Sequence, residues 1–388
     1  MTAAQEVLPE DVFKIHRRSA ELSPFHQCYA TENTILRIAA GRYYVHNNGD
    51  GPVTAYWRLR QKAVIYDVPE RPVEISGPDI VPFLEYIFAR NVSGLKAGRG
   101  VYAIACTFQG GIFMDGILFK LERDRYWYVQ PDGALETWLL AHSNGFDITV
   151  SDPHSRVLQI QGPNSLRMMQ DASEGMIDET LGYFRSGFFK IGGQQVYISR
   201  TGWTGELGFE IYTQGDDTDC PRLWDHLMTA GATHGMIFSG LQSMNIRRIE
   251  AGILDNGSDF DSSMTPFDAG LSKFIDMEKP DFIGREALLE AKPGKRLFGL
   301  ICHQATPSSG FKIFDGDNQV GFVTTGAYSP YLKAGIGYVR FSYPEEWAGR
   351  NLSMRCASDK SVICEIIDPP FYDYEKAIPR GRKVEVWE

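Results

Sequence analysis

Short apolar runs separated by turn residues dominate the first part of the chain, up to about residue 150. Val73-Glu74-Ile75 is typical of a strand, and the turn Ser76-Gly77-Pro78-Asp79 follows it directly. The apolar spacing over residues 80–88 then predicts a helix whose first turn Asp79 is placed to cap. Further strands are expected at 101–107, 117–121 and 126–129, and a helix at 138–142.

The same order of elements occurs a second time. Val157-Leu158-Gln159-Ile160 has the pattern of a strand, Gln161-Gly162-Pro163-Asn164 that of a turn, and a helix is expected to begin near Ser165. Two copies of strand, Gly-Pro turn and helix indicate two related α+β modules rather than a doubly wound sheet.

After Arg296 the pattern changes to short strands broken by turns, as in a small β-barrel or sandwich. These strands are expected at 297–302, 312–314, 321–325 and 337–341. Pro293-Gly294 is a plausible boundary before them. We therefore expect residues 1–150 to form a first α+β module with an N-terminal extension, residues 151–293 a second module, and residues 294–388 a β domain.

Composition narrows the class of protein. A chain of 388 residues is long enough for two or three packed domains. The net charge of −10 argues against a broad surface for nucleic acid or anionic membranes. Residues 1–18 carry charges where a signal peptide would need an apolar run, and no apolar run is long enough to span a membrane. The six cysteines are scattered without metal-site spacing, so no metal is expected. Cytoplasm is the default location, and the sequence does not indicate the oligomeric state.

The first stretch with candidate chemistry is Gly110-Gly111-Ile112-Phe113-Met114-Asp115-Gly116. The double glycine allows a sharp turn and a close approach to a ligand. Asp115 just beyond it is expected on a short loop, where it could bind a protonated amine or orient a nucleophile. Spacing alone favours an ordinary hairpin turn with a solvated aspartate.

The second stretch is Ser199-Arg200-Thr201-Gly202-Trp203-Thr204-Gly205-Glu206-Leu207-Gly208-Phe209-Glu210, expected between two strands. The glycines would let the backbone present the Glu206 carboxylate, which can accept two parallel hydrogen bonds from an amidine-like ring edge such as that of a pterin. No Lys-Ser/Thr follows, so this is not a phosphate loop. A purely structural turn is an equally good interpretation.

The third stretch, residues 240–252, has helical spacing and ends at Gly252. Packing of its apolar face is the default interpretation, and Arg248 is a candidate interior anchor. Arg248 and Glu250 lie too far apart around the helix to pair.

Taken in order, these stretches resemble the family of the glycine cleavage T-protein, an aminomethyltransferase. Thr204-Gly205-Glu206-Leu207-Gly208-Phe209-Glu210 and Asp281-Phe282-Ile283-Gly284-Arg285-Glu286-Ala287-Leu288 match family motifs, and similar matches run from about Tyr66 to Val339. The resemblance implies three domains around a central folate channel, the third of them a β-barrel, with tetrahydrofolate as cofactor. It places pterin binding on Glu206, a folate contact near Tyr102, and the acidic residue beside the reactive folate nitrogens on Asp115. Trp203 and Arg248 are further candidates for cofactor binding.

The departures from the family pattern shape the functional hypothesis. The first of two family aspartates is Met114 here, and an Arg-Asp pair in the helix is replaced by Met244-Asn245. The pattern is closest to the dimethylsulfoniopropionate demethylase-like branch, which favours methyl transfer to tetrahydrofolate from a small sulfonium, quaternary amine or methoxy donor. Trp203, Tyr102 and Phe108 would then be candidates for an aromatic wall around a cationic donor. The alternatives are an aminomethyltransferase and a folate-binding protein without turnover.

Overall fold

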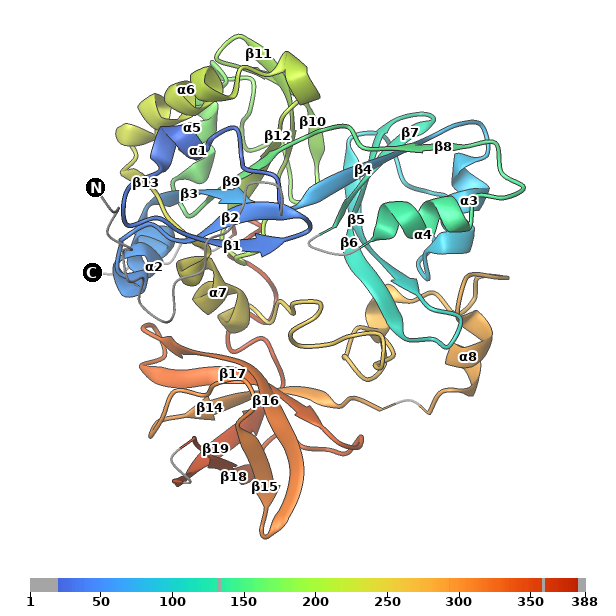
Figure 1. Ribbon diagram of the computed structural model, residues 1–388, viewed down its shortest axis with the longest axis vertical. Helices are drawn as coiled ribbons and strands as arrows, with labels where there is room; N and C mark the ends of the chain where they lie inside the picture. The colour runs from blue at the N-terminus through green and yellow to red at the C-terminus, as the bar shows by residue number, and fades with distance from the viewer. Residues whose placement is uncertain (1–19, 131–133, 293, 358–359, 383–388) are drawn as a thin grey trace, which may run out of the picture.

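The structure is a computed structural model that describes residues 20–130, 134–292, 294–357 and 360–382. Two α+β modules lie side by side, and the C-terminal barrel lies below them in the view of Figure 1. The predicted fold class, α+β with two related modules and a C-terminal β-barrel, is confirmed.

The first module is a five-stranded sheet covered on one face by two helices. Its strand order is β5-β6-β7-β4-β8, with all neighbours antiparallel. Apolar side chains of β4, α3 and α4 fill the space between sheet and helices, which explains the apolar spacing seen in the sequence. The elements are β4 (Arg71–Ser76), α3 (Ile80–Ile87), β5 (Arg99–Cys106), β6 (Ile112–Glu122), β7 (Arg125–Gln130), α4 (Leu135–Ala141) and β8 (Thr149–Ser151).

The second module is a six-stranded sheet of order β10-β11-β12-β9-β3-β13, with α5 and α6 packed on one face. The pair β3–β13 is parallel and the other pairs are antiparallel. The elements are β3 (Ala63–Val68), β9 (Val157–Gln161), α5 (Ser165–Ala172), β10 (Ser186–Ile191), β11 (Gln194–Ser199), β12 (Gly208–Tyr212), α6 (Cys220–Ala232) and β13 (Met236–Phe238).

The two modules repeat one topology and exchange a strand. In each, a first strand (β4 or β9) leads through a glycine with positive φ (Gly77 at 134°, Gly162 at 125°) into a helix and then a three-stranded meander. The strand that precedes each first strand pairs in the other sheet, since β3 lies beside β9 and β8 beside β4. A shared core of β3, β6, β7, β11 and β12 side chains then packs the sheets together. The domain limits given above stay predictions: β3 of the second sheet lies well before residue 150, and β8 of the first sheet spans the limit between residues 150 and 151.

The C-terminal domain is a closed barrel of order β14-β17-β16-β15-β18-β19. Closure leaves no open sheet edge, and alternate residues of β19 point into the barrel core. The strands are β14 (Leu297–Cys302), β15 (Lys312–Asp315), β16 (Asn318–Ser329), β17 (Ala334–Phe341), β18 (Asn351–Arg355) and β19 (Ser361–Ile367).

Helix α7 lies where the modules and the barrel meet (Figure 1). It contacts α2, β2 and the barrel strands β16 and β17, so it links the segment before β3 to the barrel. The remaining elements are α1 (His26–Tyr29), β1 (Ile35–Ala39), β2 (Arg42–Asn47), α2 (Pro52–Gln61), η2 (Gly215–Asp217), α7 (Leu241–Glu250), η3 (Ser272–Phe274) and α8 (Arg285–Glu290).

The cap assigned to Asp79 is wrong, because its side chain makes no cap hydrogen bond and instead accepts one from the backbone N–H of Asp147 at 2.9 Å. Residues 1–18 and Pro293 lie outside the described residues. Within the described ranges, no helix has the length and apolar character needed to cross a membrane.

Candidate active site

The double glycine shapes the start of β6 and packs against the chain rather than against a ligand. Gly110 has φ 80°, which favours glycine. A Cβ added to Gly111 would lie 1.8 Å from the backbone oxygen of Ser262. Gly111 therefore lets the segment around residue 262 pass directly over β6.

We expect Gly111→Ala to destabilise the protein by at least about 1–3 kcal/mol, the usual range for overpacking, because the obstacle is backbone that cannot rotate away. The measurement is the urea midpoint of the variant. Gly145→Ala is a partial control: an added Cβ meets nothing within 4 Å, although its φ of 89° carries its own strain. Equal midpoint shifts for the two variants would contradict the packing role of Gly111.

Asp115 lies within β6 and not on a loop, which corrects the expectation from the sequence. It pairs with Ile104 of β5. Met114, one position earlier, points into the core of the first module and is 4% exposed. Because neighbouring side chains in a strand face opposite ways, Asp115 points away from that core. The hairpin turn is confirmed, since Gly110 and Gly111 lie between the antiparallel strands β5 and β6, but the solvated aspartate is wrong, since Asp115 is 8% exposed.

The surroundings of Asp115 raise the pKa of its own carboxylate, which favours uptake of a proton. The hydroxyl of Tyr102 donates to its Oδ2 at 2.8 Å. Burial raises the pKa of Asp115 to about 6; the Asp255 charge also raises it, while Tyr102 and the Asn256 amide lower it. Burial and the Asp115 charge raise the pKa of Tyr102, so the tyrosine stays a hydrogen-bond donor. Tyr102 and Asp115 are therefore in direct contact, and their roles at a folate site stay predictions.

Two complementary polar atoms beside each other lack partners. Asp115 Oδ1 and Asn256 Nδ2 are both buried and make no hydrogen bond within the described part of the chain. The Asn256 amide acts on Asp115 as a hydrogen-bond donor that lowers its pKa, although neither Asp115 Oδ1 nor Asn256 Nδ2 has a partner at normal hydrogen-bond geometry. A buried acceptor and a buried donor are costly to leave unpaired, so this arrangement suits a ligand group that bonds to both.

The glycine-rich segment before β12 is a braced turn that presents Glu206. Thr204 Oγ1 donates to Gln161 Oε1 at 2.7 Å and accepts from the N–H of Glu206 at 3.1 Å. Gly205 has φ 68°. The sequence leaves open whether this segment is a structural turn or presents a carboxylate. The structure shows a turn that also carries the Glu206 carboxylate.

Two arginines hold the Glu206 carboxylate. Arg247 Nε donates to Oε1 at 2.7 Å, and Arg60 Nε lies 3.1 Å from the same oxygen. Arg60 Nη1 also lies 3.4 Å from Oε2 of Glu250. All four side chains are at most 4% exposed. A carboxylate has about four acceptor positions, so Glu206 can still accept from a ligand, and its role in pterin binding stays a prediction.

Trp203 and Arg248, both predicted to bind the cofactor, contact each other. The Arg248 guanidinium lies 5.2 Å from the Trp203 ring centroid. The same guanidinium forms an ion pair with the buried Asp259 and donates to Thr325 of the barrel at 3.3 Å. Arg248 thus also has a structural role between α7 and the barrel, and contact with a cofactor stays a prediction for both residues. Phe108, offered as part of the same aromatic wall, is 58% exposed and lies beside His142.

The segment after α7 connects these groups. It contains Asp259, the partner of Arg248, and Asp255 and Asn256, which influence the pKa of Asp115.

The sequence motifs do not single out Asn256, Arg60 or Arg247. The neighbouring Arg247-Arg248 pair is visible in the sequence, but only the fold shows that the two arginines bind different carboxylates. As expected, Arg248 does not pair with Glu250; Arg247 lies 3.8 Å from it instead.

Comparison with known proteins identifies the family. Residues 33–279 match the model of the GCVT N-terminal domain, and residues 295–373 match that of the glycine cleavage T-protein C-terminal barrel domain. The chain belongs to this family. An aminomethyltransferase of Halothermothrix orenii is 32% identical over 323 residues, which cover 81% of this chain and 89% of that protein. The glycine cleavage system aminomethyltransferase T of Bartonella henselae, a solved structure, has a TM-score of 0.83 and 25% identity, over 92% of this chain and 99% of that one.

One of the similar proteins is named for an activity other than aminomethyl transfer. The trimethylamine-oxide aldolase of Ruegeria pomeroyi is 32% identical over 350 residues, which are 85% of this chain but 44% of that protein. Together the relatives confirm that this family member is an enzyme of one-carbon transfer with tetrahydrofolate as its cofactor.

The residues present fit that cofactor. A pterin offers hydrogen-bond donors and acceptors along one edge, and the unpaired Asp115 Oδ1 and Asn256 Nδ2 offer the complementary pair. Within the described residues, no group of three or more His, Cys, Asp or Glu side chains is placed to hold a metal ion.

Proposed function

We propose that this protein is an aminomethyltransferase-like enzyme that moves a one-carbon group from a small amine to tetrahydrofolate. The observation that carries the proposal is the buried Asp115 carboxylate with its unpaired Oδ1. The names of the most similar relatives support the aminomethyl donor over the methyl donors that the sequence pattern favours. The partner is a small molecule.

Negative charge around Asp115 favours an amine as donor. Asp255 lies close enough to raise the pKa of Asp115, so two carboxylates act on the same space. A protonated amine would be attracted there, and the aromatic rings of Tyr102 and Phe274, whose centroids lie 4.6 Å apart, border the same region.

The residues of this chain would bind, orient and move a proton. Tetrahydrofolate supplies the nitrogen atoms that receive the one-carbon group. Asp115 Oδ1 is placed to accept a proton released during transfer, and a pKa of about 6 allows it to do so near neutral pH. Tyr102 holds the other oxygen of the carboxylate, which fixes the direction of Oδ1.

Methyl transfer from a sulfonium, quaternary amine or methoxy donor is the second candidate. The supporting observation is Met114, whose side chain lies in the core where the family pattern has its first aspartate. A sulfonium or quaternary amine leaves as a neutral molecule, so a single carboxylate that accepts a proton would suffice.

Product analysis separates the candidates. The purified protein is incubated with tetrahydrofolate and either an aminomethyl donor or a series of methyl donors. 5,10-Methylene-tetrahydrofolate from the aminomethyl donor is the expected result, and 5-methyl-tetrahydrofolate would instead support the second candidate. Binding of tetrahydrofolate without either product would support the third alternative, a folate-binding protein without turnover.

A further inference from the structure

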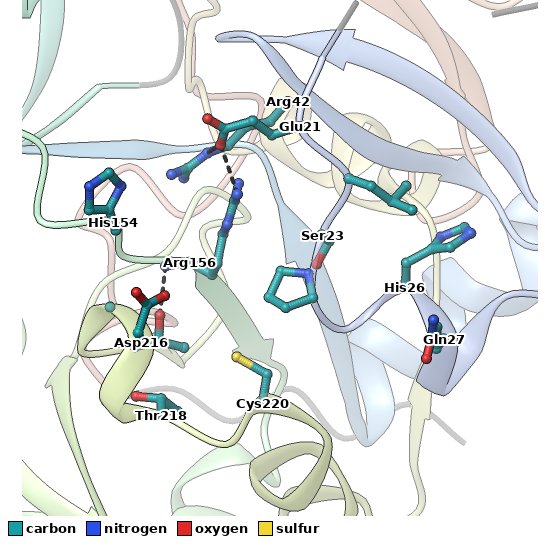
Figure 2. A pocket seen from close by; sticks show the side chains of 14 residues that line it. Glu21, Ser23, His26, Gln27, Arg42, His154, Arg156, Asp216, Thr218 and Cys220 are labelled. Carbon is teal, nitrogen blue, oxygen red and sulfur yellow. Dashed lines mark hydrogen bonds and ion pairs between the residues drawn. The ribbon is translucent and has the colours of Figure 1, made fainter. Parts of the chain in front are cut away.

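A polar pocket lies on the second module, away from the residues of the candidate active site. Its cavity volume is about 610 Å³, within the range typical of small-molecule sites. It is formed by residues 21–27, the start of β2, the segment before β9 and the segment between β12 and α6 (Figure 2). None of the candidate active-site residues lines it.

Three arginines surround one carboxylate at this pocket. Arg156 Nη2 lies 2.7 Å from Glu21 Oε2, and Arg42 Nε lies 3.5 Å from the same oxygen. Arg71 Nη2 lies 3.9 Å from Glu21 Oε1 and binds Asp152 at 2.5 Å. Figure 2 shows the Glu21 carboxylate facing the guanidinium groups of Arg42 and Arg156. Arg71 and Asp152 lie beside the pocket, whereas Arg42 and Arg156 line it together with the carboxylates of Glu21 and Asp216.

Two buried polar atoms that line the pocket have no hydrogen-bond partner. Arg42 is 3% exposed, and its Nη1 donates to the backbone oxygen of Glu70 at 2.7 Å. Its Nε keeps only the 3.5 Å ion pair with Glu21 and makes no hydrogen bond among the described residues, and Nδ1 of His26 makes none either. Burial, followed by the charges of Arg156 and Arg71, lowers the pKa of Arg42 to about 10, while the charges of Glu21 and Asp152 raise it. A buried guanidinium N–H that is held only by the half-exposed Glu21 favours an anionic ligand that can bond to it more closely.

Glu21 itself indicates which anion fits. Its side chain is 47% exposed, so it can swing out to solvent at little cost. Burial would raise the pKa of Glu21, but the charges of Arg156, Arg42 and Arg71 outweigh it and lower the pKa. A planar guanidinium matches a carboxylate by two parallel hydrogen bonds, and the chain's own carboxylate already occupies that position.

We propose that this pocket binds a small organic carboxylate, whose charged group takes the place of Glu21 between Arg42 and Arg156. The hydroxyl groups of Ser23, Thr213 and Thr218 line the rest of the pocket and would bind polar atoms of the same molecule. This inference does not depend on the proposed function, because the two sites share no residue.

The test is calorimetric titration of the full-length protein with acetate, succinate and glutarate. Succinamide, which has no charge, and inorganic phosphate are the control ligands. We expect the dicarboxylates to bind and succinamide not to bind. Glu21→Gln should tighten succinate binding about tenfold, since one charge-assisted hydrogen bond no longer has to be broken first. Arg156→Gln should abolish binding, and it suits the test better than a change at the more deeply buried Arg42.

Several outcomes would overturn the inference. If the arginines serve only to fix residues 20–25 to the sheet, Glu21→Gln binds none of the three carboxylates. Phosphate binding as tight as that of succinate would refute the assignment to carboxylates, and unchanged binding by Arg156→Gln would refute the site. Glu345→Gln, which removes the exposed partner of Arg350 on the barrel side, is the matched control and should bind succinate like the unmodified protein. Arg156→Gln should keep its one-carbon transfer rate.

Discussion

Replacement of Asp115 by asparagine is expected to lower the rate of one-carbon transfer by about 100-fold or more, the usual contribution of a proton-accepting side chain. Asparagine keeps the size of the side chain and can still accept the Tyr102 hydrogen bond, but it cannot take up a proton at Oδ1. The measurement is the rate of product formation at saturating tetrahydrofolate. A variant that keeps its full rate would remove Asp115 from the mechanism.

The pH dependence of the same reaction gives an independent check. Because burial raises the pKa of Asp115 to about 6, the proton-accepting form increases as pH rises through about 6, and the rate should rise with it. Tyr102→Phe removes a hydrogen bond that lowers this pKa, so the midpoint of the profile should move to higher pH. Asp255→Asn removes a neighbouring negative charge that raises the pKa, so its midpoint should move to lower pH. Shifts in the same direction would contradict this account of the site.

Local patterns predict most elements of the fold. The strands and helices of both Gly-Pro repeats lie where their apolar spacing places them, and the barrel strands follow the change of pattern after Arg296. The exchange of β3 and β8 between the sheets is not predictable, because no local signal states which distant strand a segment pairs with. The glycine pair does mark a turn, but the expectation of a loop at Asp115 is wrong because that turn ends at Gly111 and β6 begins directly after it.

The sequence suggests residues of the candidate site but not their partners. Its motifs single out Asp115 and Glu206, and the family resemblance adds Tyr102. The two arginines that hold Glu206 come from α2 and from α7, and Arg247 lies 41 positions away from it in the chain. Helical periodicity marks Arg247 as one of several polar positions, and only the packing of α2 against α7 brings its guanidinium to a carboxylate.

The second large effect is expected at Glu250, the last residue of α7. Its carboxylate accepts hydrogen bonds from Tyr56 at 2.8 Å, Ser329 at 2.6 Å and Tyr372 at 2.5 Å, and it pairs with Arg60. The side chain is fully buried and joins α2, α7 and the barrel strand β16. Glu250→Ala leaves three hydroxyl groups and a buried arginine without this partner, so we expect a loss of about 3–5 kcal/mol in the free energy of unfolding.

The loss is measured as the shift of the urea midpoint multiplied by the slope of the transition. Arg340→Met is the control: it breaks an ion pair of 3.0 Å with Asp261, whose side chain is 51% exposed, and should cost less than about 1 kcal/mol. Equal losses for both variants would contradict a special role for the buried network. The double variant Arg60→Met/Glu250→Met should lose less than the sum of its single changes, because removal of both charges leaves fewer buried groups unpaired. An additive loss would show that Arg60 is neutralised by Glu206 alone, and that Glu250 acts through its hydroxyl partners.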